Sequence, residues 1–298
     1  MNPSHAVVLA LSLAALAGPV LSAEAPKPQP KSRPAPQVKP TAAAGPTAKD
    51  WRTPSPDNVM VIDTNKGRVL VELTPQVAPG HVARIQELTK AGVYNGRTFF
   101  RVIDRFMAQT GDPKDTGDGG TDKPNLKAEF TFRRDAATPF VPAAAPAGLQ
   151  EGLIGSFPVV SQNSSWREVT ADGKVSAWGT YCPGVVGMAR DDDNNSANSQ
   201  FFLMRQPYPS LDKRYTAFGR VISGLDVIRA IKTGEPVAAP QDRMEKVRLL
   251  SDIPAAERPR IRVIDPMGPW FAGEIRRQRA AKGADFSVCD LKIPVEVR

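Results

Sequence analysis

Residues 99–113, FFRVIDRFMAQTGDP, contain three side chains that an ordinary apolar strand does not need. Arg101, Met107 and Gln109 all have odd numbers, and the side chains of an extended chain alternate between its two faces. The segment begins as a strand, and this pattern predicts that the guanidinium, the thioether and the amide share one face. Phe106 and Ala108 lie between them. Such a set offers a fixed cation and an amide beside apolar surface, but no obvious nucleophile.

Several catalytic classes are excluded by what the sequence lacks. It has two histidines, and His5 falls in an apolar leader. His81, which we expect at the start of a surface helix, cannot alone build a His-rich metal site or a Ser-His-Asp triad. The acidic run 191–199, DDDNNSANS, has no glycine at the sixth position of a calcium loop, and Phe202 stands where its last ligand belongs. We therefore expect a polar loop there, no metal and no cofactor.

A reaction that breaks no bond fits the remaining residues. Rotation about an X-Pro amide meets a barrier of roughly 20 kcal/mol, because the twisted state loses resonance. The prolyl nitrogen then regains its lone pair and accepts a hydrogen bond better. A fixed guanidinium aimed at that nitrogen would stabilise the twisted state more than the planar one. An apolar pocket would hold the proline ring, and an amide would orient the neighbouring carbonyl.

The elements that must position these residues are mainly strands. Residues 58–74 read as two alternating runs around Asn65-Lys66-Gly67, a hairpin signal. Further strands are predicted in GVVGMAR, SQFFLMR, YTAFGRVI and MEKVRLLSDI. Helical spacing predicts helices in APGHVARIQELTKAG, which ends near Gly92, and in GLDVIRAIKTG. Many short strands with two helices favour an antiparallel barrel over alternating βαβ units. The glycine-rich stretch KDTGDGGTDKP lacks the ending of a phosphate-binding loop and is read as a turn.

The N-terminal region reads as an export signal and a tether. Residues 1–23 contain a short apolar run that ends in small residues, which predicts a signal peptide. Residues 24–56 are rich in Pro and Ala with scattered Lys, typical of a disordered linker. We therefore expect a periplasmic or secreted protein with no stable membrane insertion. Residues 53–250 carry 24 basic and 22 acidic side chains, so no nucleic-acid footprint is indicated.

Two cysteines, Cys182 and Cys289, are present. Nothing nearby marks either one as a nucleophile. Outside the cytoplasm they could form a disulfide. The alternative is two partly buried free thiols, and the sequence leaves both open.

Three separated segments carry a family resemblance. FFRVIDRFMAQTGD, GMARDDDNNSANSQFF and LDKRYTAFGRVISGLDVI resemble, in order, the successive signatures of the cyclophilin-type peptidyl-prolyl cis-trans isomerases. The resemblance covers about residues 58–252, and it implies a closed eight-stranded antiparallel β-barrel capped by two α-helices, with a peptide groove on its outer face. By position, Arg101 and Gln109 match the catalytic residues. The residues that match the substrate-binding groove are Phe106, Met107, Ala189, Arg190, Gln200, Phe202, Leu211 and Tyr215.

Several positions depart from the family pattern. Its animal members have a tryptophan where this chain has Ser210, with Tyr208 two residues earlier, and their pocket histidine is Tyr215 here. The asparagine common after Ala189 is Arg190, a position that would bind mainly through its backbone. These changes leave the arginine mechanism intact and affect drug binding and substrate preference.

Two parts of the chain have no counterpart in the resemblance. The isomerase domain, residues 57–252, contains an insertion of about residues 136–179, in which REVTADGKVSAW predicts a hairpin with an Asp-Gly turn. Residues 253–298 form a C-terminal extension with a helix-like PWFAGEIRRQRAAK and a strand-like DFSVCDLKIPVEV. We expect an α/β structure for this extension.

The resemblance predicts a peptidyl-prolyl cis-trans isomerase that assists the folding of exported proteins. Its partners would be unfolded or extended polypeptides that contain X-Pro bonds. One alternative is a non-catalytic cyclophilin-like module or chaperone that holds extended peptides. A hydrolase on a β-barrel is a further alternative, which the lack of a usable histidine or metal set disfavours.

Overall fold

The hairpin predicted around Asn65-Lys66-Gly67 begins the main sheet of the protein. It consists of β2 (Val59–Thr64) and β3 (Gly67–Leu73), paired along their whole length. The structure is a computed structural model, and it describes residues 45–298 as one compact unit. The predicted signal peptide and residues 24–44 of the predicted linker lie outside the described residues.

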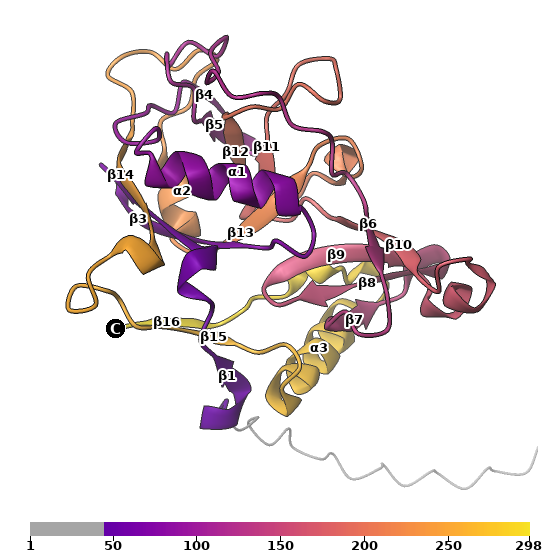
Figure 1. Ribbon diagram of the computed structural model, residues 1–298. Coiled ribbons are helices and arrows are strands. Elements are labelled where there is room, and N and C mark those ends of the chain that lie inside the picture. The colour runs from indigo at the N-terminus through magenta and orange to yellow at the C-terminus, as the bar shows by residue number, and fades with distance from the viewer. Residues whose placement is uncertain (1–44) are drawn as a thin grey trace, which may run out of the picture. The chain divides into compact units, whose positions relative to one another are not determined.

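The main sheet has eight antiparallel strands, and the other predicted strands belong to it (Figure 1). Its order is β14-β2-β3-β13-β11-β12-β5-β4. The six strands added to the hairpin are β4 (Arg101–Ile103), β5 (Met107–Thr110), β11 (Val185–Met188), β12 (Phe201–Met204), β13 (Ala217–Ser223) and β14 (Met244–Leu249). The antiparallel, mainly β class is therefore confirmed.

The barrel that the resemblance implied is not closed by a ladder of hydrogen bonds. The sheet is curled, and β14 and β4 are its two edges. The edges approach each other through an isolated bridge between Thr98 and Arg243, just before each strand begins. Phe99 N–H also donates to the Asp242 carbonyl, and Gly96 N–H to that of Met244. The segments that meet here are too short for a ladder, so the sheet is a curled half-barrel.

Two helices pack on this sheet, as expected. They are α1 (Pro79–Lys90) and the shorter α2 (Leu225–Ala230). Ile85 and Leu88 of α1 and Ile228 of α2 are buried with the apolar side chains of the sheet. Burying such side chains is worth about 1.5–3 kcal/mol each. The helices and the sheet therefore share one core.

The insertion forms a second antiparallel sheet, of order β6-β10-β9-β8-β7. The predicted hairpin in residues 167–178 is wrong, because residues Ser164–Val169 form a 3₁₀ helix, η4, capped by the Asn163 side chain. The Asp172-Gly173 turn exists, but β10 pairs with β9 and β6 instead. The strands are β6 (Phe132–Arg134), β7 (Phe140–Ala144), β8 (Leu149–Ile154), β9 (Phe157–Gln162) and β10 (Val175–Gly179).

The C-terminal extension and residues 45–56 form a third sheet, of order β1-β15-β16. Its strands are β1 (Trp51–Arg52), β15 (Ile261–Ile264) and β16 (Val295–Val297). The helix-like segment is the helix α3 (Pro269–Lys282), whereas the strand-like segment is largely irregular with strand only at β16. Residues 45–56, assigned to the linker by composition, are thus folded; Asp50 is buried and accepts the Trp270 N–H.

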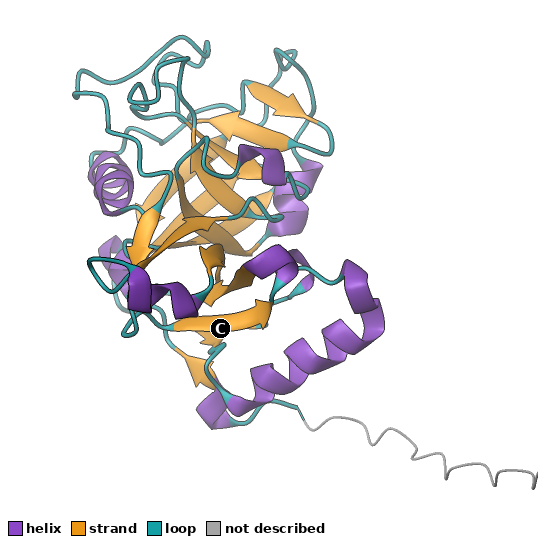
Figure 2. Ribbon diagram, turned by 90° about the vertical axis from the view of Figure 1, so that its right-hand side faces the viewer, coloured by secondary structure: helices purple, strands orange, loops and turns teal. Residues whose placement is uncertain are grey.

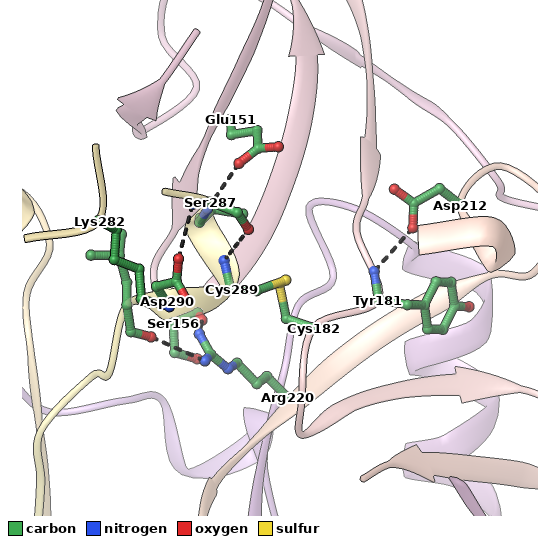
Figure 3. The surroundings of a disulfide bond; sticks show 12 residues. Glu151, Ser156, Tyr181, Cys182, Asp212, Arg220, Lys282, Ser287, Cys289 and Asp290 are labelled. Atoms are coloured by element: carbon green, nitrogen blue, oxygen red, sulfur yellow. Dashed lines mark hydrogen bonds and ion pairs between the residues drawn. A yellow bond between two sulfur atoms is a disulfide. The ribbon is translucent and has the colours of Figure 1, made fainter. Parts of the chain in front are cut away.

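The two cysteines form a disulfide that fastens the extension to the main sheet. Cys182 and Cys289 lie 5.0 Å apart at Cα and 107 residues apart in sequence (Figure 3). Arg220 of β13 reinforces this junction, since it donates to the carbonyls of Ser156 and Leu291. Figure 2 shows the extension and its long helix below the curled sheet. Within residues 45–298, no helix has the length and apolar character needed to cross a membrane.

Candidate active site

The motif of residues 99–113 is a hairpin, not one extended strand. The chain turns at residues 104–106, where Arg105 has a left-handed φ of 53°, and β5 returns antiparallel to β4. Arg101 is directly opposite Gln109, and Ile103 is opposite Met107. Opposite residues in antiparallel strands point to the same face. The three odd-numbered side chains therefore share a face, as predicted. They do so because two paired strands are in register, and not because they lie on one extended strand.

This register continues across the next strands as a row of site residues. Gln109 on β5 is opposite Phe202 on β12, and Phe202 is opposite Gly187 on β11. The row thus reads Arg101, Gln109, Phe202, Gly187 on four neighbouring strands. Four short strands from two distant parts of the sequence place the guanidinium, the amide and an aromatic ring side by side.

Gly187 in this row makes room for two aromatic rings. A Cβ at this position would come within 2.6 Å of the Tyr181 hydroxyl and 2.7 Å of the Phe202 ring. Tyr181 is fully buried and stacks on Phe202 with centroids 5.8 Å apart. Tyr215 meets the other side of Phe202 edge-on at 5.8 Å. Phe202 is therefore held in a fixed orientation by its neighbours.

Nine of the ten predicted site residues line one cavity of about 170 Å³. Its lining combines apolar side chains with the polar groups of Arg101, Gln109, Arg190 and Tyr215. Gln200 is absent from its lining but contacts Gln109 and lines the neighbouring cavity. The residues around the cavity are Arg101, Phe106, Met107, Gln109, Ala189, Arg190, Phe202, Leu211 and Tyr215.

The Arg101 guanidinium is held from two sides. Nε donates to Glu235 Oε1 at 2.5 Å, and Nη1 donates to Gln109 Oε1 at 3.2 Å. The Gln109 amide in turn donates to Gln200 Oε1 at 2.9 Å. Gln200 donates to the carbonyls of Gly117 and Gly119, both at 2.8 Å. Within residues 45–298, no group hydrogen-bonds to Nη2, so one nitrogen of a positioned guanidinium is available to a ligand.

The glycine-rich loop anchors this chain of amides. Asp112 is fully buried, and its carboxylate accepts the backbone N–H groups of Lys114, Thr116, Gly117 and Gly119. Burial alone would raise the pKa of Asp112, but these N–H groups outweigh it and lower the pKa. A Cβ on Gly119 would lie 1.8 Å from Asp112 Oδ1, so glycine is required there. The predicted turn thus supports the site.

Arg190 is used within the protein rather than pointed at a ligand. Its Nε and Nη2 donate to the Arg214 carbonyl at 3.1 and 2.9 Å, and its guanidinium lies 4.6 Å from the centre of the Tyr215 ring. The Ala189 N–H is bonded to the Gln200 carbonyl. The Arg190 side chain therefore closes one side of the cavity by stacking on Tyr215.

The η5 turn (Pro209–Leu211), a short 3₁₀ helix next to the cavity, contains Ser210, one of the positions that depart from the family pattern. The Tyr208 ring packs on Phe106 with centroids 4.6 Å apart and stays half exposed. Leu211 belongs to η5 and lines the cavity. Ser210 in the same turn lines a different cavity, beside the insertion. Leu211 thus lines the cavity and Tyr208 contacts it through Phe106, whereas Ser210 does not line it.

Four contributors were missed by the sequence reasoning. Glu235 follows a Gly and precedes a Pro in a loop, and nothing in that pattern indicates Arg101 as its partner. Tyr181 lies just after the insertion, outside every signature segment. Asp112 precedes the stretch read as a turn, and Gly119 lies within it. The Gly-Asp pair after a strand was the one signal that could have indicated a carboxylate organising a glycine-rich loop.

The residues considered for metal chemistry have structural roles. His81 is fully buried, not on a surface, and its Nδ1 lies 2.6 Å from Glu129 Oε2. Glu129 also accepts the N–H groups of Gly80 and His81 at the start of α1. In the acidic loop, Asp193 accepts the Asn195 N–H. Among residues 45–298, no group of three or more His, Cys, Asp and Glu side chains is placed to hold a metal ion.

Comparisons with known proteins agree with this geometry. The model of the family described as cyclophilin type peptidyl-prolyl cis-trans isomerase/CLD matches residues 59–251. A probable peptidyl-prolyl cis-trans isomerase of Brucella suis biovar 1 is 36% identical over 190 residues, which cover 60% of this chain and 74% of that protein. The peptidyl-prolyl cis-trans isomerase-like 1 protein of Aspergillus niger is 31% identical over 170 residues, covering 57% of this chain and 78% of that protein.

A solved structure resembles more of the chain than the family model matches. The crystal structure of cyclophilin AquaCyp293 from Hirschia baltica has a TM-score of 0.78 and 34% identity. It covers 85% of this chain and 98% of that one. This coverage exceeds residues 59–251, so the similarity reaches beyond the span of the family model. The chain belongs to the cyclophilin-type peptidyl-prolyl cis-trans isomerases.

Proposed function

We propose that this isomerase acts by aiming the Arg101 guanidinium at the nitrogen of a twisted X-Pro amide. The nitrogen accepts a hydrogen bond well only when resonance is lost, so the contact strengthens in the transition state. The observation that carries the proposal is the shared cavity, in which Arg101 lies with an apolar pocket of about 170 Å³. No proton is transferred and no covalent intermediate is needed.

The other cavity residues have distinct roles in this mechanism. Phe106, Met107 and Phe202 surround the pyrrolidine ring, and their burial of apolar surface favours binding. Gln109 lies beside Arg101 and orients the carbonyl next to the prolyl bond. The amide chain from Gly119 through Gln200 and Gln109 holds the guanidinium before substrate arrives. Such preorganised donors contribute most when they need not reorganise during the reaction.

Replacement of Arg101 tests this mechanism. Removal of one preorganised donor typically costs about 10²–10³ in rate. We therefore expect Arg101→Ala to lose about that much kcat/KM in an NMR exchange assay on an X-Pro peptide. Arg101→Lys should recover little, because a point charge does not reproduce the planar guanidinium. Near-normal turnover by a folded Ala variant would refute the mechanism.

The same assay separates catalysis from passive peptide binding. A cyclophilin-like chaperone would bind X-Pro peptides with a measurable Kd and leave their exchange rate unchanged. The positioned Arg101 and Gln109 favour catalysis, since a passive groove needs no donor aimed at an amide nitrogen. Binding without rate enhancement by the wild type would favour the chaperone.

We further infer that the protein acts on exported polypeptides outside the cytoplasm. The disulfide between Cys182 and Cys289 supports this location, since disulfides persist mainly in oxidising compartments. The apolar run in residues 1–23 is the second support. Cell fractionation and N-terminal sequencing of the mature protein test both. An intact N-terminus in the cytoplasmic fraction would overturn the inference.

A further inference from the structure

A second cavity, of about 600 Å³, lies beside the turn that bounds the prolyl pocket. We call it the insertion cavity, because strands of the insertion form one of its walls. Its lining comes from three parts of the chain: the insertion, the loop that contains η5, and the C-terminal extension. The lining residues are Pro146, Leu149, Glu151, Val160, Trp178, Thr180, Pro209, Ser210, Asp212, Lys213, Arg214, Ser287 and Cys289.

The parts that enclose the insertion cavity are fixed to one another. The disulfide of Cys289 with Cys182 ties the extension to the main sheet, and Glu151 of β8 accepts the Val288 N–H at 2.8 Å (Figure 3). Asp212 accepts the Tyr181 N–H at 3.0 Å, which fixes the η5 loop to the residue next to Cys182. The cavity is therefore built by restrained elements and not by a loose loop.

The wall contributed by the insertion is apolar. Leu149, Val160 and Trp178 lie on it, and Trp178 is held by a hydrogen bond to Asp212 and by Lys213 Nζ, 4.4 Å from its ring centre. Lys213 itself has a left-handed φ of 58°, a strained conformation for this residue. Two acidic and two basic side chains also line the cavity. Such a surface suits an aromatic or large aliphatic side chain better than an ion.

The insertion cavity and the prolyl pocket are neighbours at the η5 turn, whose consecutive residues line one or the other. Leu211 lines the prolyl pocket, whereas its neighbours Ser210 and Asp212 line the insertion cavity. A single helical turn with its side chains is on the order of 10 Å across. An extended peptide advances about 3.3 Å per residue, so about three residues cross it. A peptide held by its proline thus reaches the second cavity.

We propose that the insertion cavity is an accessory subsite that binds an apolar side chain of the same polypeptide whose proline occupies the prolyl pocket. This inference rests on the proposed peptide groove and adds substrate selection to it. The occupant is an aromatic or large aliphatic residue about three positions from the proline. Binding there lowers KM without raising kcat, because the contact is the same in the planar and twisted states.

A peptide scan tests the subsite. Peptides of equal length with one X-Pro bond carry a single Phe or a matched Ser at successive positions on either side of the proline. KM and kcat come from NMR exchange, and Kd from fluorescence anisotropy. We expect Phe to lower KM and Kd about tenfold at one position, roughly three residues from the proline, with kcat unchanged. Equal Kd values at every position would overturn the proposal.

Variants of the apolar wall localise the effect. Leu149→Ser and Pro146→Ser remove apolar surface from the cavity, and each should reduce the Phe-to-Ser ratio of Kd toward one. Val169→Ser is the matched control, because Val169 is an exposed insertion residue outside the cavity and its variant should keep the ratio. An unchanged ratio in both wall variants would overturn the subsite. If Phe selectivity appears in Kd while no peptide is isomerised, the proposed mechanism fails and the subsite stands.

Discussion

Arg101 uses two of its guanidinium nitrogens within the protein before any substrate arrives. Gln109 holds Nη1 from the neighbouring strand, and Glu235 holds Nε from the loop after α2. The ion pair with Glu235 is open to solvent, with side chains 38% and 54% exposed. Such a pair contributes little to stability. Its consequence is geometric, since together with Gln109 it restricts the orientation of the guanidinium that lines the cavity.

Glu235 is therefore expected to position Arg101 without contacting substrate. Glu235→Ala should lower kcat about two- to fivefold with little change in KM, since an exposed pair is worth about 0.2–1 kcal/mol. Glu235→Gln keeps an acceptor oxygen for Nε and should retain most of kcat. The pair of variants is measured with the same X-Pro peptide. A loss by the Gln variant as large as that of the Ala variant would contradict the positioning role.

Asp212 is a carboxylate with an unfavourable charge at neutral pH. Burial raises its pKa to about 6, against hydrogen bonds from Thr180, the Tyr181 N–H and Trp178 that lower it. The unfolded value is about 3.9, so the folded state binds the proton more tightly. The stability that this proton contributes is fully present below about pH 4 and is lost as the pH rises through about 6.

Replacing Asp212 by asparagine should remove this pH dependence. From pH 7 to pH 4, the wild type should gain on the order of 2 kcal/mol of unfolding free energy relative to Asp212→Asn. Urea unfolding of both proteins at several pH values gives this difference in unfolding free energy. The contributions of all other carboxylates cancel, because both proteins contain them. Parallel pH curves for the two proteins would show that folding does not raise the pKa of Asp212.

At the scale of elements, strand register assembles the site. The row through Arg101, Gln109, Phe202 and Gly187 draws on β4, β5, β12 and β11, which come from two distant parts of the sequence. The sequence indicated the shared face within residues 99–113 because two-residue periodicity survives a hairpin in which odd positions face odd positions. Phe202 on β12 was predicted only through the family resemblance, and Gly187 on β11 was not predicted as a site residue, because register between distant strands depends on tertiary contacts.

The insertion shows where pattern reasoning fails. The Asp172-Gly173 turn was recognised, since glycine adopts the left-handed φ of 63° that it needs. The residues before it form η4 instead of a strand, and β10 finds its partners in β6 and β9. A local sequence signal predicts a turn. Which strands pair with each other depends on the apolar side chains that the pairing buries. The five-stranded sheet could not be derived from a hairpin signal.

The η5 turn bears on drug binding, because its Ser210 replaces the tryptophan of animal cyclophilins. That tryptophan offers cyclosporin an apolar wall and an indole N–H. Trp178 of the insertion does not substitute for it, since its own N–H bonds to Asp212. Loss of a central interface aromatic commonly costs 2 kcal/mol or more, about thirtyfold in affinity. We expect weak inhibition of the wild type by cyclosporin and stronger inhibition of Ser210→Trp.

Titration of cyclosporin against the wild type and against Ser210→Trp measures the predicted difference in inhibition. The Tyr208 ring, already packed on Phe106, is the group that could rebuild the wall. A Tyr208→Ala variant is therefore the control. Nanomolar inhibition of the wild type that disappears in this variant would mean that Tyr208 has taken the place of the tryptophan.

At the scale of the whole molecule, the three sheets are fastened by contacts that composition does not reveal. The Pro- and Ala-rich pattern extends to residue 56, yet β1 pairs with β15, and Asp50 is buried beside α3. The sequence left both a disulfide and free thiols open, because proximity across 107 residues follows from the fold. The family was recognisable from three motifs, whereas the extension was recognised only as helix-like and strand-like segments.

Removal of the disulfide should loosen the extension more than the main sheet. A loop of about 100 residues corresponds to about 4.7 kcal/mol in the chain-entropy model, and measured losses are typically about 2–5 kcal/mol. Cys289→Ser should therefore lower Tm by roughly 5–15 °C. Hydrogen exchange should rise first in α3 and the residues near 289. Uniform acceleration across the main sheet would contradict this separation.

The pairing of β1 with β15 joins residues that are far apart in the chain, with Trp51 opposite Ile264. During synthesis the N-terminal residues leave the ribosome first. Trp51 then has no strand partner until residue 264 has been made, whereas the hairpin of β2 and β3 can form at once. Long-range pairings form slowly because the intervening chain must be ordered first. During synthesis, β1 is therefore an unpaired edge that a chaperone can hold. Until β15 has been made, this isomerase can therefore itself be a substrate of folding chaperones.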